Sequence, residues 1–272
     1  MNRHFSSVPV VRRVAAISLA VLVVTLLVLA MPRPARAFGD RGAFDARVLL
    51  AGGTTGAARP TAPFRWAHEL VMRTSAPARS RPTSVRADDG EIVSSPFLYW
   101  SGDVALTPLS SAEISGLRRF FALGGLLVVD DAGVNFDGDK SEFGRTARAQ
   151  IARVLPDSAI IQIGPEHVIF KSFYLLHRAE GRVQGPKTLD AIVRGGSVQV
   201  LFTNHDLGGA LAQGPTGVWE YPVVPGGEAQ RDHAVRLAVN IAMYLLCSNY
   251  KDDQVHAPFL IRRRSRVRES EP

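Results

Sequence analysis

The chain has a single cysteine in 272 residues and lacks the fixed motifs of several enzyme classes. One cysteine, Cys247, excludes an internal disulfide framework, and because it falls in an apolar helical stretch we expect it to be buried. There is no G-x-S-x-G elbow, no H-E-x-x-H zinc motif, and the glycine-rich segment 52–56 lacks both the G-x-G-x-x-G spacing and a Walker lysine. We therefore expect no cofactor and no metal, and the sequence offers little support for nucleophilic catalysis.

The formal net charge of +7 comes from the two ends of the chain and not from residues 38–261. Residues 1–37 contain five arginines and no acid, and residues 262–272 contain five arginines and two glutamates. This leaves 22 basic and 23 acidic side chains in residues 38–261. A nearly neutral body lacks the electrostatic footprint of a nucleic-acid-binding protein, so DNA and RNA are excluded as expected partners.

The N-terminal segment has the layout of a targeting signal. Arginines precede an uncharged run over residues 14–31, and Ala35-Arg36-Ala37 forms an A-x-A cleavage site. The run just reaches the length of a spanning helix, so residues 1–37 are expected to be a signal peptide or an N-terminal membrane anchor. We expect the protein to be exported and either periplasmic or anchored facing the periplasm, with one α/β domain over residues 38–256 and a basic disordered tail over residues 257–272.

Short apolar runs alternate with amphipathic helical segments along this body. Residues 126–129 are apolar at every position, which favours a parallel strand covered on both faces. This alternation predicts an α/β fold: a doubly wound, mostly parallel sheet with helices on both faces. We expect strands at 47–51, 97–100, 126–129, 159–163 and 198–203, and helices at 64–72, from the capping box Ser110–Glu113 to Gly124, at 143–155 and at 232–247.

Polar side chains and glycines follow the expected strands. Ligands of open parallel sheets bind beyond the carboxyl ends of the strands, so the residues at these positions are the candidate ligand-binding residues. They are Gly53, Asp103, Asp130, Asp131, His167, Asn204, His205 and Asp206. Of these, Asp131, His205 and Asp206 are the catalytic candidates, although adjacent residues of a strand face opposite sides, so Asp130 and Asp131 are poorly placed to act as a pair.

Three interpretations of this edge stay open. It could be a binding surface without catalysis, or the site of a hydrolase in which His205 or His167 is the base and Asp131 or Asp206 orients it. The acids could instead be structural, because carboxylates at strand ends commonly accept backbone N–H groups or form turns. In that case we expect Asp130 to bind N–H groups of the loop that follows it.

Several blocks of the sequence together resemble a bacterial family, domain-of-unknown-function family 4159 (DUF4159). The resemblance extends from about residue 44 to residue 246. The blocks are FLYWSG at 97–102, GGLLVVDD at 124–131, PEH at 165–167 followed by FKSFY at 170–174, NHDLG at 204–208 and RLAVNI at 236–241.

This family is similar to the class I glutamine amidotransferase-like superfamily, which includes the trehalose-utilisation-type proteins. The resemblance implies a flavodoxin-like sheet and a sharp turn after residues 126–129, where active amidotransferases hold their cysteine and this chain has Asp131. A carboxylate in place of the thiol removes the thioester chemistry, so the resemblance argues against glutaminase activity. It also implies envelope partners such as von Willebrand factor A-type or MoxR-associated proteins, and the expected function is a non-catalytic binding or assembly module, with a hydrolase-like enzyme as the alternative.

Overall fold

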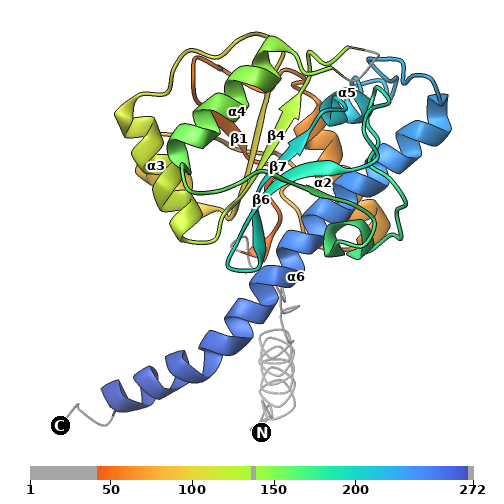
Figure 1. Cartoon of the computed structure of the whole chain (residues 1–272). Helices are drawn as coiled ribbons and strands as arrows, with labels where there is room; N and C mark the ends of the chain where they lie inside the picture. The colour runs from red at the N-terminus through yellow and green to blue at the C-terminus, as the bar shows by residue number, and fades with distance from the viewer. Residues whose placement is uncertain (1–41, 136–138, 269–272) are drawn as a thin grey trace, which may run out of the picture. The chain divides into compact units, whose positions relative to one another are not determined.

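The computed structural model describes residues 42–135 and 139–268, which form a seven-stranded sheet flanked by helices (Figure 1). The strands are β1 (Val48–Leu50), β2 (Ser84–Arg86), β3 (Phe97–Gly102), β4 (Leu126–Asp131), β5 (Ile161–Ile163), β6 (Leu189–Arg194) and β7 (Ser197–Thr203). Their order is β2-β1-β3-β4-β7-β6-β5. Neighbours from β2 to β7 pair in parallel, whereas β6 is antiparallel to both β7 and β5. The predicted α/β, mostly parallel sheet is therefore confirmed.

The central strands β3 and β4 are buried at every residue and pair along their whole length. Because successive side chains of a strand point to opposite faces, Leu126 and Val128 belong to one hydrophobic cluster, and Leu127 and Val129 belong to the other. The unbroken apolar run thus supplies two cores at once, as expected for a strand covered on both faces.

Helices cover both faces of the sheet (Figure 1). One core cluster is formed with α2 (Ala62–Thr74), α5 (Leu207–Leu211) and α6 (Gly227–Arg268), and the other with α3 (Ser111–Ala122) and α4 (Glu142–Val154). Two short 3-10 helices, η2 (Gly90–Ser94) and η3 (Val168–Lys171), lie in the connections before β3 and β6. This arrangement leaves the loops after the strands free to meet at one edge of the sheet.

The helix starts follow the local sequence signals. At α3 the hydroxyl of Ser110 accepts a hydrogen bond from the N–H of Glu113 at 3.2 Å, and the Glu113 carboxylate accepts one from the N–H of Ser110 at 2.8 Å. This is the predicted capping box, and Gly124 adopts a φ of 80° just after the helix ends. At α4 the cap is Ser141, whose hydroxyl accepts from the N–H of Gly144 at 3.3 Å.

Three elements were not predicted from the sequence. Strand β2 buries only Val85, so its three residues carry no periodic signal. Strand β6 has the sequence LDAIVR, in which charged residues interrupt the apolar pattern. Helix α5 has the sequence LGGAL, and its two glycines have a low helix propensity, so the sequence does not predict a helix there. All three depend on contacts with neighbouring elements rather than on local propensity.

The C-terminal helix is longer than the sequence predicts. Helix α6 extends from Gly227 to Arg268, beyond the expected range of 232–247 and into the segment expected as a tail from residue 257. Cys247 is exposed instead of buried, and the last buried residue before it in this helix is Leu245. The expected leader over residues 1–37 lies outside the described residues, and the division into leader, domain and tail stays a prediction. Within the described ranges, no helix is long and apolar enough to cross a membrane.

Gly116 provides a test of how closely α3 packs on the chain after β2. A Cβ atom at this position would overlap the carbonyl oxygen of Ala87, which belongs to the backbone and cannot rotate away. We expect Gly116→Ala to lower the free energy of unfolding by about 1–3 kcal/mol, although alanine at an open helix position would raise it by about 1 kcal/mol. Urea denaturation measures the difference. The control is Ser115→Ala at the exposed neighbouring position, and a Gly116→Ala protein as stable as wild type would refute the close contact.

Candidate functional site

The loops after β1, β4 and β7 meet at the carboxyl edge of the sheet. The guanidinium of Arg59, in the β1 loop, donates to the carbonyl oxygen of Ala132 at 2.9 Å and to the carboxylate of Asp206 at 2.9 Å. The N–H of Ala58 donates to the hydroxyl of Ser101 at the end of β3, at 3.0 Å. The ends of β1, β3, β4 and β7 therefore share one edge, and Arg59 joins three of its loops.

Asp130 is the most enclosed acid of this edge, with no exposed surface. Its carboxylate accepts four hydrogen bonds: from the hydroxyls of Tyr99 (2.6 Å) and Thr203 (2.5 Å), and from the N–H groups of Leu207 (2.9 Å) and Gly208 (2.8 Å). Burial and the negative charge of Asp206 raise its pKa to about 6, while these donors favour the charged form and limit the rise. Each oxygen accepts two hydrogen bonds, so the Asp130 carboxylate links β3, β7 and α5.

Asp131 faces the opposite side of the sheet, and its carboxylate is also hydrogen-bonded on both oxygens. Its carboxylate accepts hydrogen bonds from the hydroxyl of Ser141 (2.5 Å), the N–H of Ser141 (2.9 Å) and the N–H of Gly133 (3.2 Å). Gly144 packs directly against it, because a Cβ atom there would overlap the carboxylate. The expected separation of the two adjacent acids onto opposite faces is confirmed, and Asp131 anchors the start of α4.

Asp206 occupies a strained turn between β7 and α5, with a φ of 48° and a ψ of 62°. Such a strand-to-helix turn is the geometry in which α/β hydrolases present their nucleophile. Apart from glycines, the described residues contain one other positive φ, at Ser75. The resemblance to amidotransferases places the sharp turn after β4, at Asp131, but the non-glycine residue of this edge with a left-handed backbone is Asp206, after β7.

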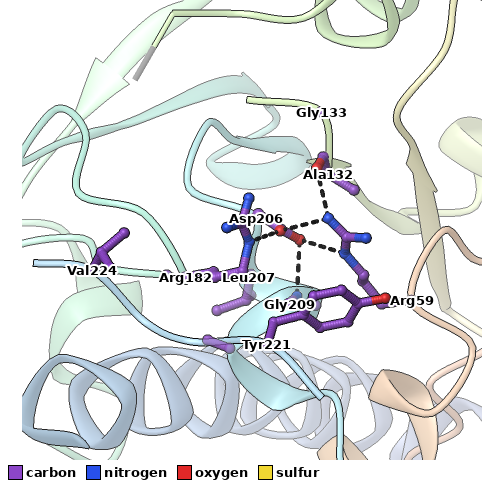
Figure 2. A network of polar contacts seen from close by, with 12 residues as sticks. Arg59, Ala132, Gly133, Arg182, Asp206, Leu207, Gly209, Tyr221 and Val224 are labelled. Atoms are coloured by element: carbon purple, nitrogen blue, oxygen red, sulfur yellow. Dashed lines mark hydrogen bonds and ion pairs between the residues drawn. The ribbon is translucent and has the colours of Figure 1, made fainter. Parts of the chain in front are cut away.

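The carboxylate of Asp206 is completely buried between two arginines (Figure 2). Arg59 binds it with Nε and Nη2, Arg182 binds it with Nε, and the N–H of Gly209 donates to it at 2.9 Å. The guanidinium of Arg59 also lies 4.2 Å from the centre of the Tyr221 ring. Burial lowers the pKa of Arg59, but the hydrogen bond and charge of Asp206 raise it further, so that it ends above its ordinary value. Arg59 is therefore a permanent cation here.

His205 is buried beside this network and points away from it. Its Nε2 lies 2.8 Å from the carbonyl oxygen of Pro186, which can only accept, so Nε2 carries a proton, and burial favours the neutral ring in which Nδ1 carries none. Its Nδ1 has no hydrogen-bond partner among the described residues. Burial lowers the pKa of His205. The side-chain oxygen of the neighbouring Asn204 accepts a hydrogen bond from Nη2 of Arg148 at 3.1 Å.

The remaining candidates lie apart from these acids. His167 caps η3 and stacks 6.2 Å from the ring of Tyr244, whose hydroxyl accepts from Val198 at the start of β7. The acids follow Thr203 at the other end of that strand, about 16 Å away along five residues. Gly53 and Asp103 are exposed in the loops after β1 and β3. His167 is thus removed from the edge, while Gly53 and Asp103 form part of its rim.

Sequence reasoning missed the residues that neutralise the acids. Arg59 and Arg182 do not belong to any recognisable sequence motif. Tyr99 and Thr203 lie inside strands, where the sequence pattern predicts that side chains are part of the hydrophobic core. One usable signal was the pair Gly208-Gly209, because a Cβ atom at either position would overlap Tyr99 or the Asp206 carboxylate. A glycine pair directly after a polar strand end indicates a close approach of side chains to the backbone.

The arrangement limits the chemistry available at this edge. All three aspartates accept hydrogen bonds on both oxygens, and none is free to take a proton from a substrate. Over residues 42–135 and 139–268, no group of three or more histidine, cysteine or acidic side chains is placed to hold a metal ion. The interpretation that the acids are structural is supported for Asp130, although it binds the loop after β7 and not the loop that follows it.

Comparison with known proteins identifies a family but no characterised relative. A family model described as "Domain of unknown function (DUF4159)" matches residues 46–246, which is most of the chain. No curated protein matches the sequence.

The ion pairs of Asp206 can be tested with one isosteric change. Asp206→Asn keeps the left-handed turn, which asparagine tolerates, but removes the negative charge that Arg59 and Arg182 both bind. We expect the free energy of unfolding to fall by about 3 kcal/mol, measured by urea denaturation. Adding Arg59→Met to this variant removes one unpaired cation and should restore part of the loss. Strictly additive effects of the two changes would contradict the coupling between them.

The buried neutral His205 predicts a pH dependence of stability. Its pKa is lowered in the folded protein, so below about pH 6.5 the unfolded chain binds a proton that the folded chain does not. The unfolding free energy contributed by His205 should therefore fall as the pH falls, by about 1.4 kcal/mol per pH unit until the folded pKa is reached.

The measurement compares wild type with His205→Gln, whose amide can still donate to Pro186. Subtracting the two urea-denaturation curves from pH 8 to pH 5 removes the opposite contribution of Asp130, whose pKa is raised. A difference that does not change with pH would show that the folded protein accepts the proton at this ring.

Proposed function

The chain belongs to the DUF4159 family, whose name assigns no activity, and we propose that it is a non-catalytic binding or assembly module of the cell envelope. In this proposal the module is exported, periplasmic or anchored facing the periplasm, and the rim of the strand-end edge contacts a partner. A von Willebrand factor A-type or MoxR-associated envelope protein is the proposed partner class.

The observation that best supports this proposal is that the carboxylate of Asp206 is buried and hydrogen-bonded on both oxygens. A nucleophile or general base needs a lone pair that faces the substrate. Here both oxygens of Asp206 are taken by Arg59, Arg182 and Gly209, and the side chain has no exposed surface. Asp206 thus serves as the internal counter-ion of two arginines.

A second function, a hydrolase-like enzyme, is favoured by one observation only. The strained turn at Asp206 costs about 1–3 kcal/mol, and such strain is often kept at functional positions. Catalysis by Asp206 would require Arg59 and Arg182 to withdraw. His205 could not serve as its base in the present arrangement, because Nε2 donates to Pro186 and Nδ1 is enclosed.

A turnover screen separates the two functions. The purified protein is assayed on ester, amide and glycoside panels, with EDTA and with added Mg²⁺, Ca²⁺ or Zn²⁺. We expect no turnover under any of these conditions. Turnover that is lost in Asp206→Asn, at a temperature where circular dichroism shows this variant to be folded, would establish the hydrolase instead.

The binding function is tested by site-specific photocrosslinking. A crosslinker replaces the exposed Asp103 at the strand-end rim or, as the matched control, the exposed Arg194 in the hairpin at the other edge. The probe is the von Willebrand factor A-type protein encoded by the same host. We expect adducts from position 103 and not from position 194, whereas equal yields or none would reject this rim as the contact surface.

A further inference from the structure

The opposite edge of the sheet, where helices end and strands begin, exposes large apolar side chains. Each of three helix-to-strand connections presents at least one: Met72 in the last turn of α2, Leu123 directly after α3, and Ile160 before β5. Met72 and Leu123 keep 69% and 73% of their surfaces exposed. Folding of this domain does not require apolar residues at such positions, since all three lie outside both core clusters.

Arginines accompany these apolar side chains. Exposed ones include Arg81 before β2, Arg118 and Arg119 at the end of α3, and Arg194 in the β6–β7 hairpin. Between the ends of α3 and α4 lies an open groove of about 250 Å³, lined by both Arg118 and Arg194. Arg118 also caps α4 by donating to the carbonyl oxygens of Val154 and Arg153, at 3.0 Å each.

The two edges of the sheet differ in charge. Asp157 is the one acid that lines the groove. The strand-end edge, in contrast, carries Asp103, Asp130, Asp131 and Asp206, and the first turns of α3 and α4 add Glu113 and Glu142. In the groove, therefore, one acid faces two arginines, Arg118 and Arg194. Helix dipoles explain arginines near helix ends, but they do not explain exposed leucine or methionine beside them.

Both ends of the folded core lie toward this basic edge. Phe44, close to the start of the described chain, precedes β1 and bridges to Ala78 ahead of β2. Helix α6 passes the start of β7, where Tyr244 accepts a hydrogen bond from Val198. In the sequence, the uncharged run of residues 14–31 precedes this core, and five arginines between residues 262 and 268 follow it.

We propose that this edge binds the surface of an anionic phospholipid bilayer. Arginines at an interface attract acidic headgroups, and isolated apolar side chains between them insert at the boundary with the acyl chains. The groove beside Arg194 accepts a phosphate-bearing headgroup, and the strand-end rim faces away from the membrane. The inference concerns a surface different from the strand-end rim and stands whether or not that rim binds a protein.

The test uses residues 38–272, because both core clusters lie between Phe44 and Leu245 and the uncharged N-terminal run would bind lipid by itself. Sedimentation with vesicles measures partitioning onto phosphatidylcholine alone and onto phosphatidylcholine with 30% phosphatidylglycerol, about a physiological anionic content. We expect at least about tenfold tighter binding to the anionic vesicles, falling as NaCl increases.

Two double variants of equal net charge locate the binding surface. Arg119→Glu with Arg194→Glu changes the basic edge, and Arg86→Glu with Arg145→Glu changes exposed arginines at the strand-end edge. The first pair should weaken binding to anionic vesicles at least about tenfold, and the second should leave it within about twofold. Leu123→Ser should weaken binding about threefold without altering its salt dependence.

Folding controls distinguish a loss of lipid binding from a loss of structure. Circular dichroism and thermal unfolding confirm that every variant is folded, which is expected because all the changed side chains are exposed. Equal binding by the two double variants would overturn the proposal and assign the affinity to another part of the chain. Failure of wild type to bind anionic vesicles would overturn it as well, while leaving the crosslinking test of the strand-end rim unaffected.

Discussion

The buried carboxylate of Asp130 is the interaction on which the arrangement of this edge depends. It lies at the end of the central strand and accepts hydrogen bonds from β3, from β7 and from the first turn of α5. A charge without exposed surface is tolerated only where donors replace water, and here four donors do so. Because those donors come from three elements, the carboxylate fixes how β7 and α5 lie against the middle of the sheet.

Asp206 shows how a potentially reactive position becomes structural. The turn after β7 has the backbone strain of a nucleophile elbow, yet the side chain on it neutralises Arg59 and Arg182. Its negative charge also raises the pKa of Asp130, so the two acids are coupled through the same small region. The buried carboxylates of Asp130, Asp131 and Asp206 are all hydrogen-bonded on both oxygens, which suits a rigid surface for binding better than acid–base chemistry.

The two edges of the sheet differ in physical character. Acids and helix N-termini gather where the strands end, and arginines pair with two of these acids, Asp206 and Asp190. Exposed arginines and apolar side chains lie where the strands begin. Of these arginines, Arg118 donates hydrogen bonds to carbonyl oxygens at the C-terminal end of α4. The proposed partner protein and the proposed lipid surface would therefore contact opposite edges and could be bound at the same time.

The sequence alone determined the α/β class, the two-faced central strand, the capping box of α3 and the placement of Asp130 and Asp131 on opposite faces. These follow from periodicity and local hydrogen bonding, which act over a few residues. It did not reveal β2, β6 or α5, the left-handed turn at Asp206, or the arginines that enclose this acid. Arg59 is 147 positions from Asp206 in the chain, and only the tertiary structure brings the two together. Local patterns encode which face a side chain takes, whereas its partner across the edge is decided by the packing of the whole sheet.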